Sequence, residues 1–245
     1  MSDTWIILGA TSSMARAFTR AVASDGSSVI LCGRDSEDMA ATATDTKAMG
    51  ATEVDVFIVD VRKPKTFVAP LKLAAERTGT INVAVFVGSM PEQADIDAKP
   101  QLLAGTITDS FTGPAEFLTR AAPIIEDRGA GTVVGIGSVA GDRGRLRNYV
   151  YGSAKAGFHT YLAGLRNRLS RSGGHVVTVK PGFVDTSMTW GLDGMFLVAS
   201  PEDVARDILK AVRKKRNVIY TPFFWLFIML IIRHIPEPIF KKLKI

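Results

Sequence analysis

Short runs of apolar residues alternate along this chain with longer segments in which apolar positions recur with the period of a helix. Such segments are typical of amphipathic helices, and the short runs are typical of strands that are covered on both faces. The predicted strands are Trp5–Leu8, Ser28–Cys32, Val54–Val59, Val83–Val87, Thr132–Ile136, His175–Val179 and Asn217–Tyr220.

The order of these elements predicts the architecture. Met14, Phe18 and Val22 form one apolar stripe after the first strand, and similar segments follow the later strands. The repeated strand–helix order predicts a single Rossmann-like α/β domain, a doubly wound parallel sheet with right-handed crossovers, over residues 1–220. An apolar C-terminal extension follows at 221–245. A ligand of such a sheet binds outside the carboxyl ends of the strands.

Composition narrows the class of protein. The length of 245 residues suits one α/β domain, and 30 basic against 24 acidic residues give a net charge of +6. These charges are dispersed, except at Arg213–Arg216 and Lys241–Lys244, so we expect no nucleic-acid partner. Cys32 is the only cysteine, which excludes an internal disulfide and fits a reducing, cytoplasmic location.

A glycine-containing turn joins the first strand to its helix in the sequence LGATSSMAR. Backbone N–H groups and the helix dipole at such a turn form a binding site for a pyrophosphate, as in a dinucleotide. Ser13 and Ala15 stand where the usual second and third glycines would be. An ordinary tight turn is therefore the alternative interpretation of this segment.

Tyr151 and Lys155 form the candidate acid–base pair. Four positions on a helix place them roughly 40° apart on one face, whereas Tyr149 lies about 120° from the lysine. A phenol with a pKa near about 10 is a poor acid–base group at neutral pH, so we expect the Lys155 ammonium to lower it. His159, further along the same segment, is predicted to lie too far from Tyr151 to share its site.

Four elements in order give the chain a family resemblance. These are the turn Gly9–Ala15, Asp60 after the third strand, Ser138 followed by Tyr151-x-x-x-Lys155, and Pro181–Gly182. With them the chain resembles the short-chain dehydrogenase/reductase family over nearly its whole length. The resemblance implies hydride transfer between a nicotinamide cofactor and a carbonyl or alcohol, and a homodimer or homotetramer.

The resemblance also implies roles for particular residues. Tyr151 exchanges a proton with the substrate oxygen, Ser138 hydrogen-bonds that oxygen, and Lys155 also binds the nicotinamide ribose. Asp60 and Val61 resemble the pair that contacts adenine. The predicted cofactor-binding residues are Gly9, Thr11, Ser12, Ser13, Met14, Arg34, Asp60, Val61, Gly88, Tyr151, Lys155, Pro181, Gly182, Val184 and Thr186. No metal site is predicted.

Two positions depart from the family pattern. Where the family has Asn-Asn-Ala-Gly after the fourth strand, this chain has Val85 to Gly88. The active-site asparagine of the family, which helps to hold a proton-relay water, aligns with Ser110. Ser110 and the neighbouring Asp109 are the two candidates to hold that water.

The end of the second strand is compatible with two cofactors. An acidic side chain there binds the adenosine ribose 2′-OH, whereas an arginine clamps a 2′-phosphate. Gly33 stands at this position and Arg34 follows it, which favours NADP over NAD. In the alternative, Arg34 is a solvated loop cation and Asp35 binds the ribose.

The segment 184–200 matches the substrate-covering lid of the family. Its apolar residues are Met188, Trp190, Leu192, Met195 and Phe196. An apolar lid favours an apolar or bulky substrate, and flexible methionines suit an adaptable surface. In the alternative, these side chains are buried against their own domain.

The C-terminal tail holds the longest apolar run of the chain, Phe223–Ile232. It has about half of the roughly 20 residues that a helix needs to cross a bilayer. Flanked by Arg233 and the lysines of the last residues, it is predicted to dock at an anionic membrane surface. Packing into a subunit interface or into its own core is the alternative.

The tail sharpens the resemblance. Its Arg-His-Ile-Pro and final Ile-Phe-x-Lys-Leu-x-Ile are similar to the end of decaprenylphosphoryl-2-keto-erythropentose reductases. That subgroup implies a lipid-linked keto sugar as substrate, a flavin-dependent oxidase as partner, and a place at the inner face of the cell membrane. A soluble alcohol dehydrogenase or ketoreductase for a small apolar substrate is the first alternative. A nucleotide-binding scaffold without turnover is the second, and intact Ser138, Tyr151 and Lys155 argue against it.

Overall fold

The strands form one parallel sheet. The computed structural model describes residues 3–188 and 197–243, and its seven-stranded sheet has the order β3-β2-β1-β4-β5-β6-β7. The strands are β1 (Thr4–Leu8), β2 (Ser28–Gly33), β3 (Val54–Ile58), β4 (Ile81–Val85), β5 (Gly131–Ile136), β6 (Gly174–Pro181) and β7 (Val218–Thr221). The predicted doubly wound fold is confirmed. Two predicted strands are shifted: β7 by one residue, to Val218–Thr221, and β4 so that it ends at Val85 rather than Val87, since β5 pairs with β4 only through Val83–Val85.

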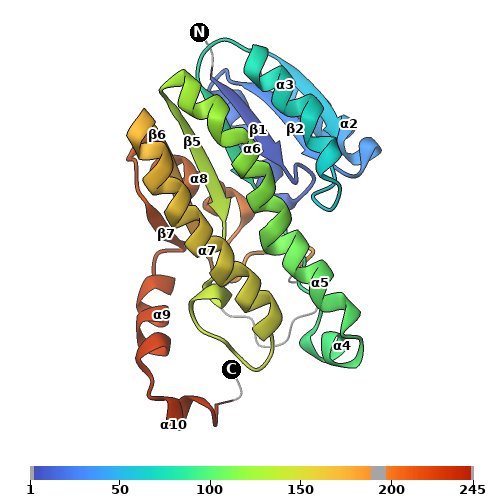
Figure 1. Ribbon diagram of the computed structural model, residues 1–245. Helices are drawn as coiled ribbons and strands as arrows, with labels where there is room; N and C mark the ends of the chain where they lie inside the picture. The colour runs from blue at the N-terminus through green and yellow to red at the C-terminus, as the bar shows by residue number, and fades with distance from the viewer. Residues whose placement is uncertain (1–2, 189–196, 244–245) are drawn as a thin grey trace.

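Helices cover both faces of the sheet (Figure 1). One layer consists of α1 (Ser13–Ser24), α2 (Ser36–Ala48) and α8 (Pro201–Arg213), and the other of α3 (Val68–Glu76), α6 (Gly113–Arg128) and α7 (Tyr149–Leu169). The predicted stripe on α1 packs into the first layer, with Phe18 and Val22 fully buried and Met14 partly buried. Alternate residues of the same strands face the two layers, so the molecule has a core on each side of the sheet.

The edge strand β3 differs from the prediction of full cover. Val56 and Ile58 are 39% and 51% exposed. β3 pairs only with β2, so it has a neighbouring strand on one side only. An apolar run predicts a strand, but it does not predict the place of that strand in the sheet.

Several short elements gather beyond the carboxyl ends of the strands (Figure 1). They are α4 (Gln93–Ala98), α5 (Gln101–Ile107), the π-helical turn η2 (Thr108–Thr112), the 3-10 turn η3 (Val139–Asp142), α9 (Trp225–His234) and α10 (Glu237–Phe240). Two further 3-10 turns are η1 (Pro64–Phe67) and η4 (Ser170–Ser172). η2 joins α5 to α6 without a break, and π-turns of this kind are frequent at functional sites.

The tail helix α9 has two different apolar faces. Trp225 and Met229 are buried in a small cluster with Val139. The opposite face is exposed and carries Leu226, Phe227, Leu230 and Ile231, and Phe223, just before the helix, is exposed as well. The tail therefore packs on its own domain through one face only. Among the described residues no helix combines the length and the apolar character needed to cross a membrane.

Candidate active site

The turn after β1 is built around Gly9. The N–H groups of Gly9 and Ala10 both donate to the carbonyl of Cys32 at the end of β2, at 2.8 and 3.1 Å. Gly9 has a φ of +84°, and a Cβ there would lie 3.0 Å from a methyl carbon of Val87. Only glycine therefore suits this position. The turn holds the carboxyl ends of β1, β2 and β4 together.

The amino end of α1 follows this turn. Ser12 is the N-cap, and its hydroxyl accepts a hydrogen bond from the Ala15 N–H at 3.2 Å. No acidic residue occupies the first turn of α1. The helix dipole and the first-turn N–H groups thus face the carboxyl end of the sheet without a competing carboxylate. The predicted residues Thr11, Ser13 and Met14 all lie in this turn or at the start of the helix.

The end of β2 presents a cation rather than a carboxylate. Arg34 is exposed there, directly after Gly33. Asp35 is the N-cap of α2, and its side chain accepts hydrogen bonds from the N–H groups of Glu37 and Asp38. The carboxylate that the alternative assigned to a ribose is therefore engaged in capping its own helix.

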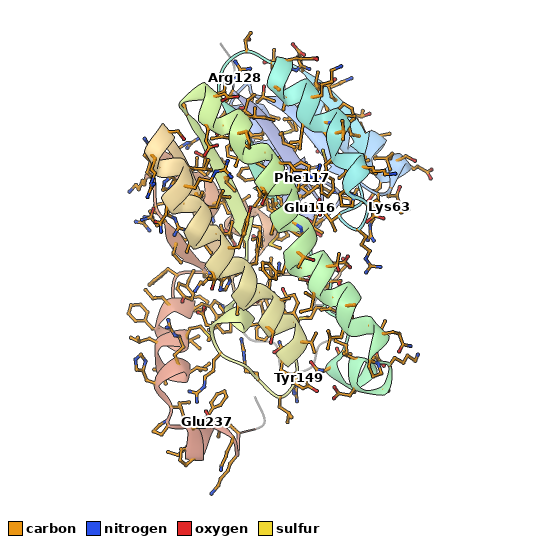
Figure 2. The ribbon with its side chains drawn as sticks, in the orientation of Figure 1. Lys63, Glu116, Phe117, Arg128, Tyr149 and Glu237 are labelled. Atoms are coloured by element: carbon orange, nitrogen blue, oxygen red, sulfur yellow. The ribbon has the colours of Figure 1, made fainter. Side chains whose placement is uncertain are left out.

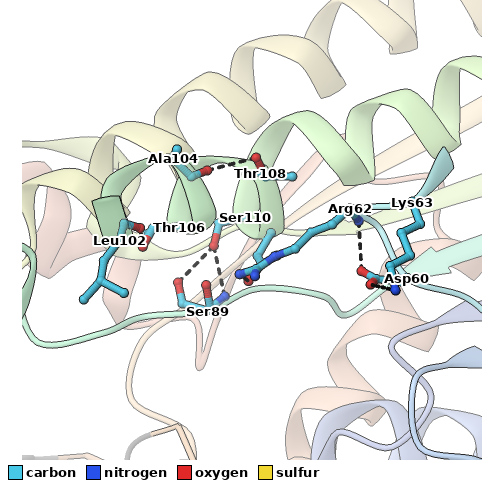
Figure 3. A network of polar contacts seen from close by, with 10 residues as sticks. Asp60, Arg62, Lys63, Ser89, Leu102, Ala104, Thr106, Thr108 and Ser110 are labelled. Atoms are coloured by element: carbon cyan, nitrogen blue, oxygen red, sulfur yellow. Dashed lines mark hydrogen bonds and ion pairs between the residues drawn. The ribbon is translucent and has the colours of Figure 1, made fainter. Parts of the chain in front are cut away.

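Asp60 and Val61 belong to a second loop on this side of the sheet, and Figure 3 shows Asp60 with Arg62 and Lys63. The Asp60 carboxylate accepts the Arg62 N–H at 2.9 Å, and Val61 is buried. A Cβ on Gly113, at the start of α6, would lie 2.6 Å from the Val61 carbonyl oxygen. Close contact with α6 therefore fixes the position of this loop.

Ser138, Tyr151 and Lys155 meet at the carboxyl end of β5. Ser138 is the N-cap of η3, where its hydroxyl accepts the Ala140 N–H, and its side chain lies close enough to the Tyr151 phenol to affect the pKa of that group. The Lys155 ammonium is buried one helical turn after Tyr151 and donates to the carbonyl of Ile136 at 2.9 Å and of Val87 at 3.5 Å. The structure thus brings the three predicted catalytic residues together.

The expected effect of Lys155 on Tyr151 is not observed. Burial raises the pKa of the Tyr151 phenol to about 12, and the hydrogen bond from Ser138 opposes this rise. Lys155 points at backbone carbonyls, and its Nζ lies 5.8 Å from the centroid of the tyrosine ring. Burial also lowers the pKa of Lys155 to about 8. Desolvation outweighs the attraction between the two groups.

Tyr149 lies outside this group. Its side chain is 43% exposed at the first residue of α7 and donates to the carboxylate of Asp97 in α4 (Figure 2). As the helical spacing predicted, Tyr151 lies on the same face of α7 as Lys155 and Tyr149 does not.

The two candidates for the missing asparagine have other partners. Ser110 in η2 is fully buried, and its hydroxyl accepts the Ser89 N–H and donates to the Ser89 carbonyl, both at 3.1 Å (Figure 3). Asp109 forms a two-point ion pair with Arg62, with both contacts at 2.7 Å. Both carboxylate oxygens of Asp109 are thus engaged by Arg62. Ser110 instead steadies the loop after β4.

Gly88 connects this loop to the site. A Cβ there would lie 3.3 Å from Nζ of Lys155 and 3.5 Å from Oγ of Ser110. Glycine thus leaves room for the side chains of both Lys155 and Ser110 beside this loop. The loop that lacks the asparagines of the family is held by Ser110 and bounded by Lys155.

The residues after β6 line the same end of the sheet. β6 extends to Pro181 rather than ending at Val179 as predicted, because Pro181 pairs with Thr221 of β7. The N–H of Gly182 donates to the Thr221 carbonyl at 3.1 Å. Val184 and Thr186 are both buried, and Val184 forms an isolated bridge with Ala199.

That bridge joins the two ends of the predicted lid. Among the apolar residues of the predicted lid, Met188 is exposed. Four others lie outside the described residues: Trp190, Leu192, Met195 and Phe196.

His159 contacts the backbone of Ser138, which the sequence interpretation did not predict. Its Nε2 accepts a hydrogen bond from the backbone N–H of Ser138 at 3.3 Å. Tyr151, Lys155 and His159 follow one another at intervals of four along α7, so they share the face that meets β5. This interval was the signal available in the sequence. Distance from Tyr151 was the wrong criterion, because the imidazole reaches Ser138 instead.

These residues fit a nicotinamide dinucleotide. Gly9 forms a turn that a Cβ would fill, the first turn of α1 supplies N–H donors, and Arg34 is a cation beside the end of β2. Tyr151 and Lys155 lie on the far side of β4 from that turn, at the carboxyl end of β5. Among the described residues no cluster of side chains is suited to hold a metal ion.

Comparisons with known proteins agree with this site. The sequence pattern of the family described as short chain dehydrogenase matches residues 3–195. An uncharacterized oxidoreductase of Mycobacterium tuberculosis is 29% identical over 241 residues, which are 97% of this chain and 96% of the relative. Two solved structures share the fold of this chain.

A short-chain dehydrogenase from Sphingobium yanoikuyae in complex with NADPH has a TM-score of 0.81 and 22% identity, and the match covers 91% of this chain and 88% of the other. An actinorhodin polyketide ketoreductase with NADPH has a TM-score of 0.79 and 21% identity, and the match covers 89% and 95%. At these identities the two structures show a shared fold.

Proposed function

Because this chain belongs to the short chain dehydrogenase family, we propose that it is an NADP-preferring reductase that converts a ketone into a secondary alcohol. The observation that carries the proposal is the buried contact of Tyr151 with Ser138, one helical turn from Lys155. Groups with shifted pKa values in such a cluster are typical of catalytic sites.

The protonation states of the site are compatible with reduction. The raised pKa of Tyr151 keeps the phenol protonated at neutral pH, as a proton donor requires. When bound, NADPH supplies the hydride that reduces the carbonyl carbon. Tyr151 gives its proton to the carbonyl oxygen, and Ser138 holds that oxygen by a hydrogen bond. Lys155, with a pKa of about 8, is mainly charged at pH 7 and stabilises the tyrosinate that remains.

The cofactor preference rests on Arg34. Its guanidinium is exposed beside the end of β2, where the family binds the adenosine ribose, and Asp35 is engaged as a helix cap. A planar guanidinium suits a 2′-phosphate. The two related structures described above contain NADPH, which supports the same choice.

We expect Arg34→Ala to weaken NADPH binding by about 1–3 kcal/mol, the range of a hydrogen bond to a charged group, and to change NADH binding little. Titration of nicotinamide fluorescence measures both affinities. Lys47→Ala is the matched control, because Lys47 is an exposed cation at the other end of α2. Tighter binding of NADH than of NADPH by the wild-type protein would contradict this assignment.

The same samples test turnover. With 9,10-phenanthrenequinone, a reactive diketone that needs little specific recognition, the wild-type protein should oxidise NADPH faster than NADH. Tight NADPH binding without oxidation would favour the nucleotide-binding scaffold instead.

We further propose that the ketone belongs to a lipid-linked sugar used in envelope glycan synthesis, with a flavin-dependent oxidase as the preceding enzyme. Support comes from the exposed face of α9, where Ile231 is 68% exposed beside Phe227 and Leu230. Arg233 and the exposed Lys241 follow this face along the tail. An apolar stripe beside cations suits the surface of an anionic membrane, at the inner face of the cell membrane.

We expect the protein to float with vesicles of phosphatidylglycerol and phosphatidylcholine at low salt, and to dissociate as salt is raised. Replacing Phe227 and Ile231 by serine should lower the bound fraction at least about tenfold, because each exposed apolar side chain contributes roughly 1.5–3 kcal/mol when buried. Met49→Ser with Val68→Ser is the control, since these side chains are exposed elsewhere.

Two outcomes would count against the membrane proposal. One is a wild-type protein that stays in the soluble fraction at low salt. The other is an oligomer, expected in this family as a dimer or tetramer, that dissociates when Phe227 and Ile231 are replaced. The exposed face of α9 would then be a subunit interface.

A further inference from the structure

Three hydrogen bonds engage Ser138 itself, beside the bond that the preceding Gly137 N–H donates to Val179 of β6 at 2.7 Å. The Ser138 carbonyl accepts the Gly141 N–H, and the Ser138 hydroxyl accepts the Ala140 N–H, both at 3.1 Å. Both contacts lie within η3 and its cap, so they shape the turn without fixing it to the rest of the molecule. The third contact, from the Ser138 N–H to Nε2 of His159 in α7, joins the turn to a neighbouring helix.

Two glycines make the space for this imidazole. A Cβ on Gly137 would lie 2.1 Å from Nε2 of His159, and one on Gly141 would lie 2.7 Å from its Cε1. Both distances are shorter than any packed side chain tolerates. The glycines before and after Ser138 therefore fit the histidine as a matched set.

The other end of the turn is fixed by Asp142. Its carboxylate accepts a hydrogen bond from the Lys180 ammonium of β6 and one from the Tyr220 hydroxyl of β7, both at 2.6 Å. The Asp142 side chain is only 3% exposed, and its Oδ1 lies 3.7 Å from Nδ1 of His159. Buried charges of this kind require such partners.

These contacts define the state of His159. Since Nε2 accepts the Ser138 N–H, the proton of the neutral ring lies on Nδ1, on the side of Asp142. Burial and then the Lys180 ammonium lower the pKa of His159 to about 3, and Asp142 opposes this. A lowered histidine pKa favours the neutral form, so the ring remains an acceptor at physiological pH.

We propose that His159 is a positioning residue that acts through Ser138: it holds the backbone of Ser138 so that the hydroxyl stays against Tyr151. This inference rests on the catalytic role proposed above for Ser138. Displacement of a catalytic group by about 1 Å is sufficient to reduce turnover by about a hundredfold. The network also explains why glycines, rather than residues with side chains, stand at positions 137 and 141 on either side of Ser138.

Substitution at His159 should therefore affect turnover more than cofactor binding. For reduction of 9,10-phenanthrenequinone, His159→Leu should lower kcat about tenfold to a hundredfold and leave the Kd for NADPH within about twofold. His159→Gln, whose side-chain carbonyl can accept the Ser138 N–H, should recover most of kcat. His175→Leu is the matched control, because His175 bonds the Arg216 carbonyl away from the site and should retain full turnover.

A double-mutant cycle separates positioning from a general structural role. In a Ser138→Ala background, His159→Leu should lower kcat by less than about twofold, because no hydroxyl remains to be positioned. An equal loss in both backgrounds, or no rescue by His159→Gln, would overturn the proposal.

Nitrogen-15 NMR of the wild-type protein tests the contact itself without a substrate. His159 should be a neutral ring protonated at Nδ1 throughout pH 5–8. A ring protonated at Nε2, or one that gains a charge in this range, would overturn the proposal even if the protein reduced no quinone. A wild-type protein with the expected NMR signals but no turnover would instead count against the proposed reductase function.

Discussion

Replacing Tyr151 by phenylalanine is expected to lower kcat for 9,10-phenanthrenequinone by about 10²- to 10⁴-fold, the range for loss of a general acid. The change removes one hydroxyl and keeps the ring that is buried on α7. NADPH binding should remain within about twofold of the wild-type value, because the turn at Gly9 and the cation at Arg34 are untouched. Stopped-flow or steady-state oxidation of NADPH measures kcat, and fluorescence titration measures binding.

Tyr149→Phe provides the control for this prediction. Tyr149 is exposed, and its hydroxyl donates to Asp97, so loss of that bond should change kcat by less than about threefold. Similar activity in the two variants would show that Tyr151 does not donate the proton. If both variants lost activity, the exposed hydroxyl and Asp97 would belong to the site instead.

Much of this site was predictable from local patterns. Alternating apolar runs and helical stripes define the sheet, and the carboxyl ends of parallel strands must lie at one edge. Tyr151 and Lys155 were found by helical spacing, and Ser138 by its place after a predicted strand. Each of these predictions depends on residues that are close in sequence or on one rule of topology.

Contacts across the fold were not predictable in this way. Asp109 and Arg62 belong to different elements, and nothing in either segment indicates their pairing. The sequence placed Lys155 near Tyr151 correctly, but it gave no measure of burial, which decides the direction of both pKa shifts. His159 was missed because its partner is a backbone N–H, which no residue type identifies.

The C-terminal tail shows a second limit of prediction from sequence. The run Phe223–Ile232 is apolar all round, so its sequence does not distinguish the face that packs from the face that stays exposed. The structure resolves this through the loops that α9 contacts. Arg143, next to η3, donates to the carbonyls of Ile232 and Ile235 and pairs with Glu237 of α10. These contacts orient the helix.

The buried face of α9 should therefore be essential for the stability of the site. Trp225 is 2% exposed, and its ring lies edge-on to Phe183 at 5.6 Å between centroids. A Cβ on Gly182 would lie 1.9 Å from its Nε1, so the indole packs directly on the loop after β6. Trp225→Ala should lower the free energy of unfolding by about 3–5 kcal/mol, the usual cost of removing a buried tryptophan.

That loss should be visible as a fall in Tm of roughly 6–20 °C, since about 1 kcal/mol shifts Tm by about 2–4 °C in a domain of this size. Leu226→Ala is the control, because Leu226 is the next residue along the exposed face and should cost little. Trp225 also packs with Val139, the residue after Ser138, so kcat should fall in Trp225→Ala even below its Tm. Equal melting of the two variants would mean that α9 contributes nothing to the domain. The tail would then serve only its exposed face, and removing it at Thr221 would leave the catalytic residues undisturbed.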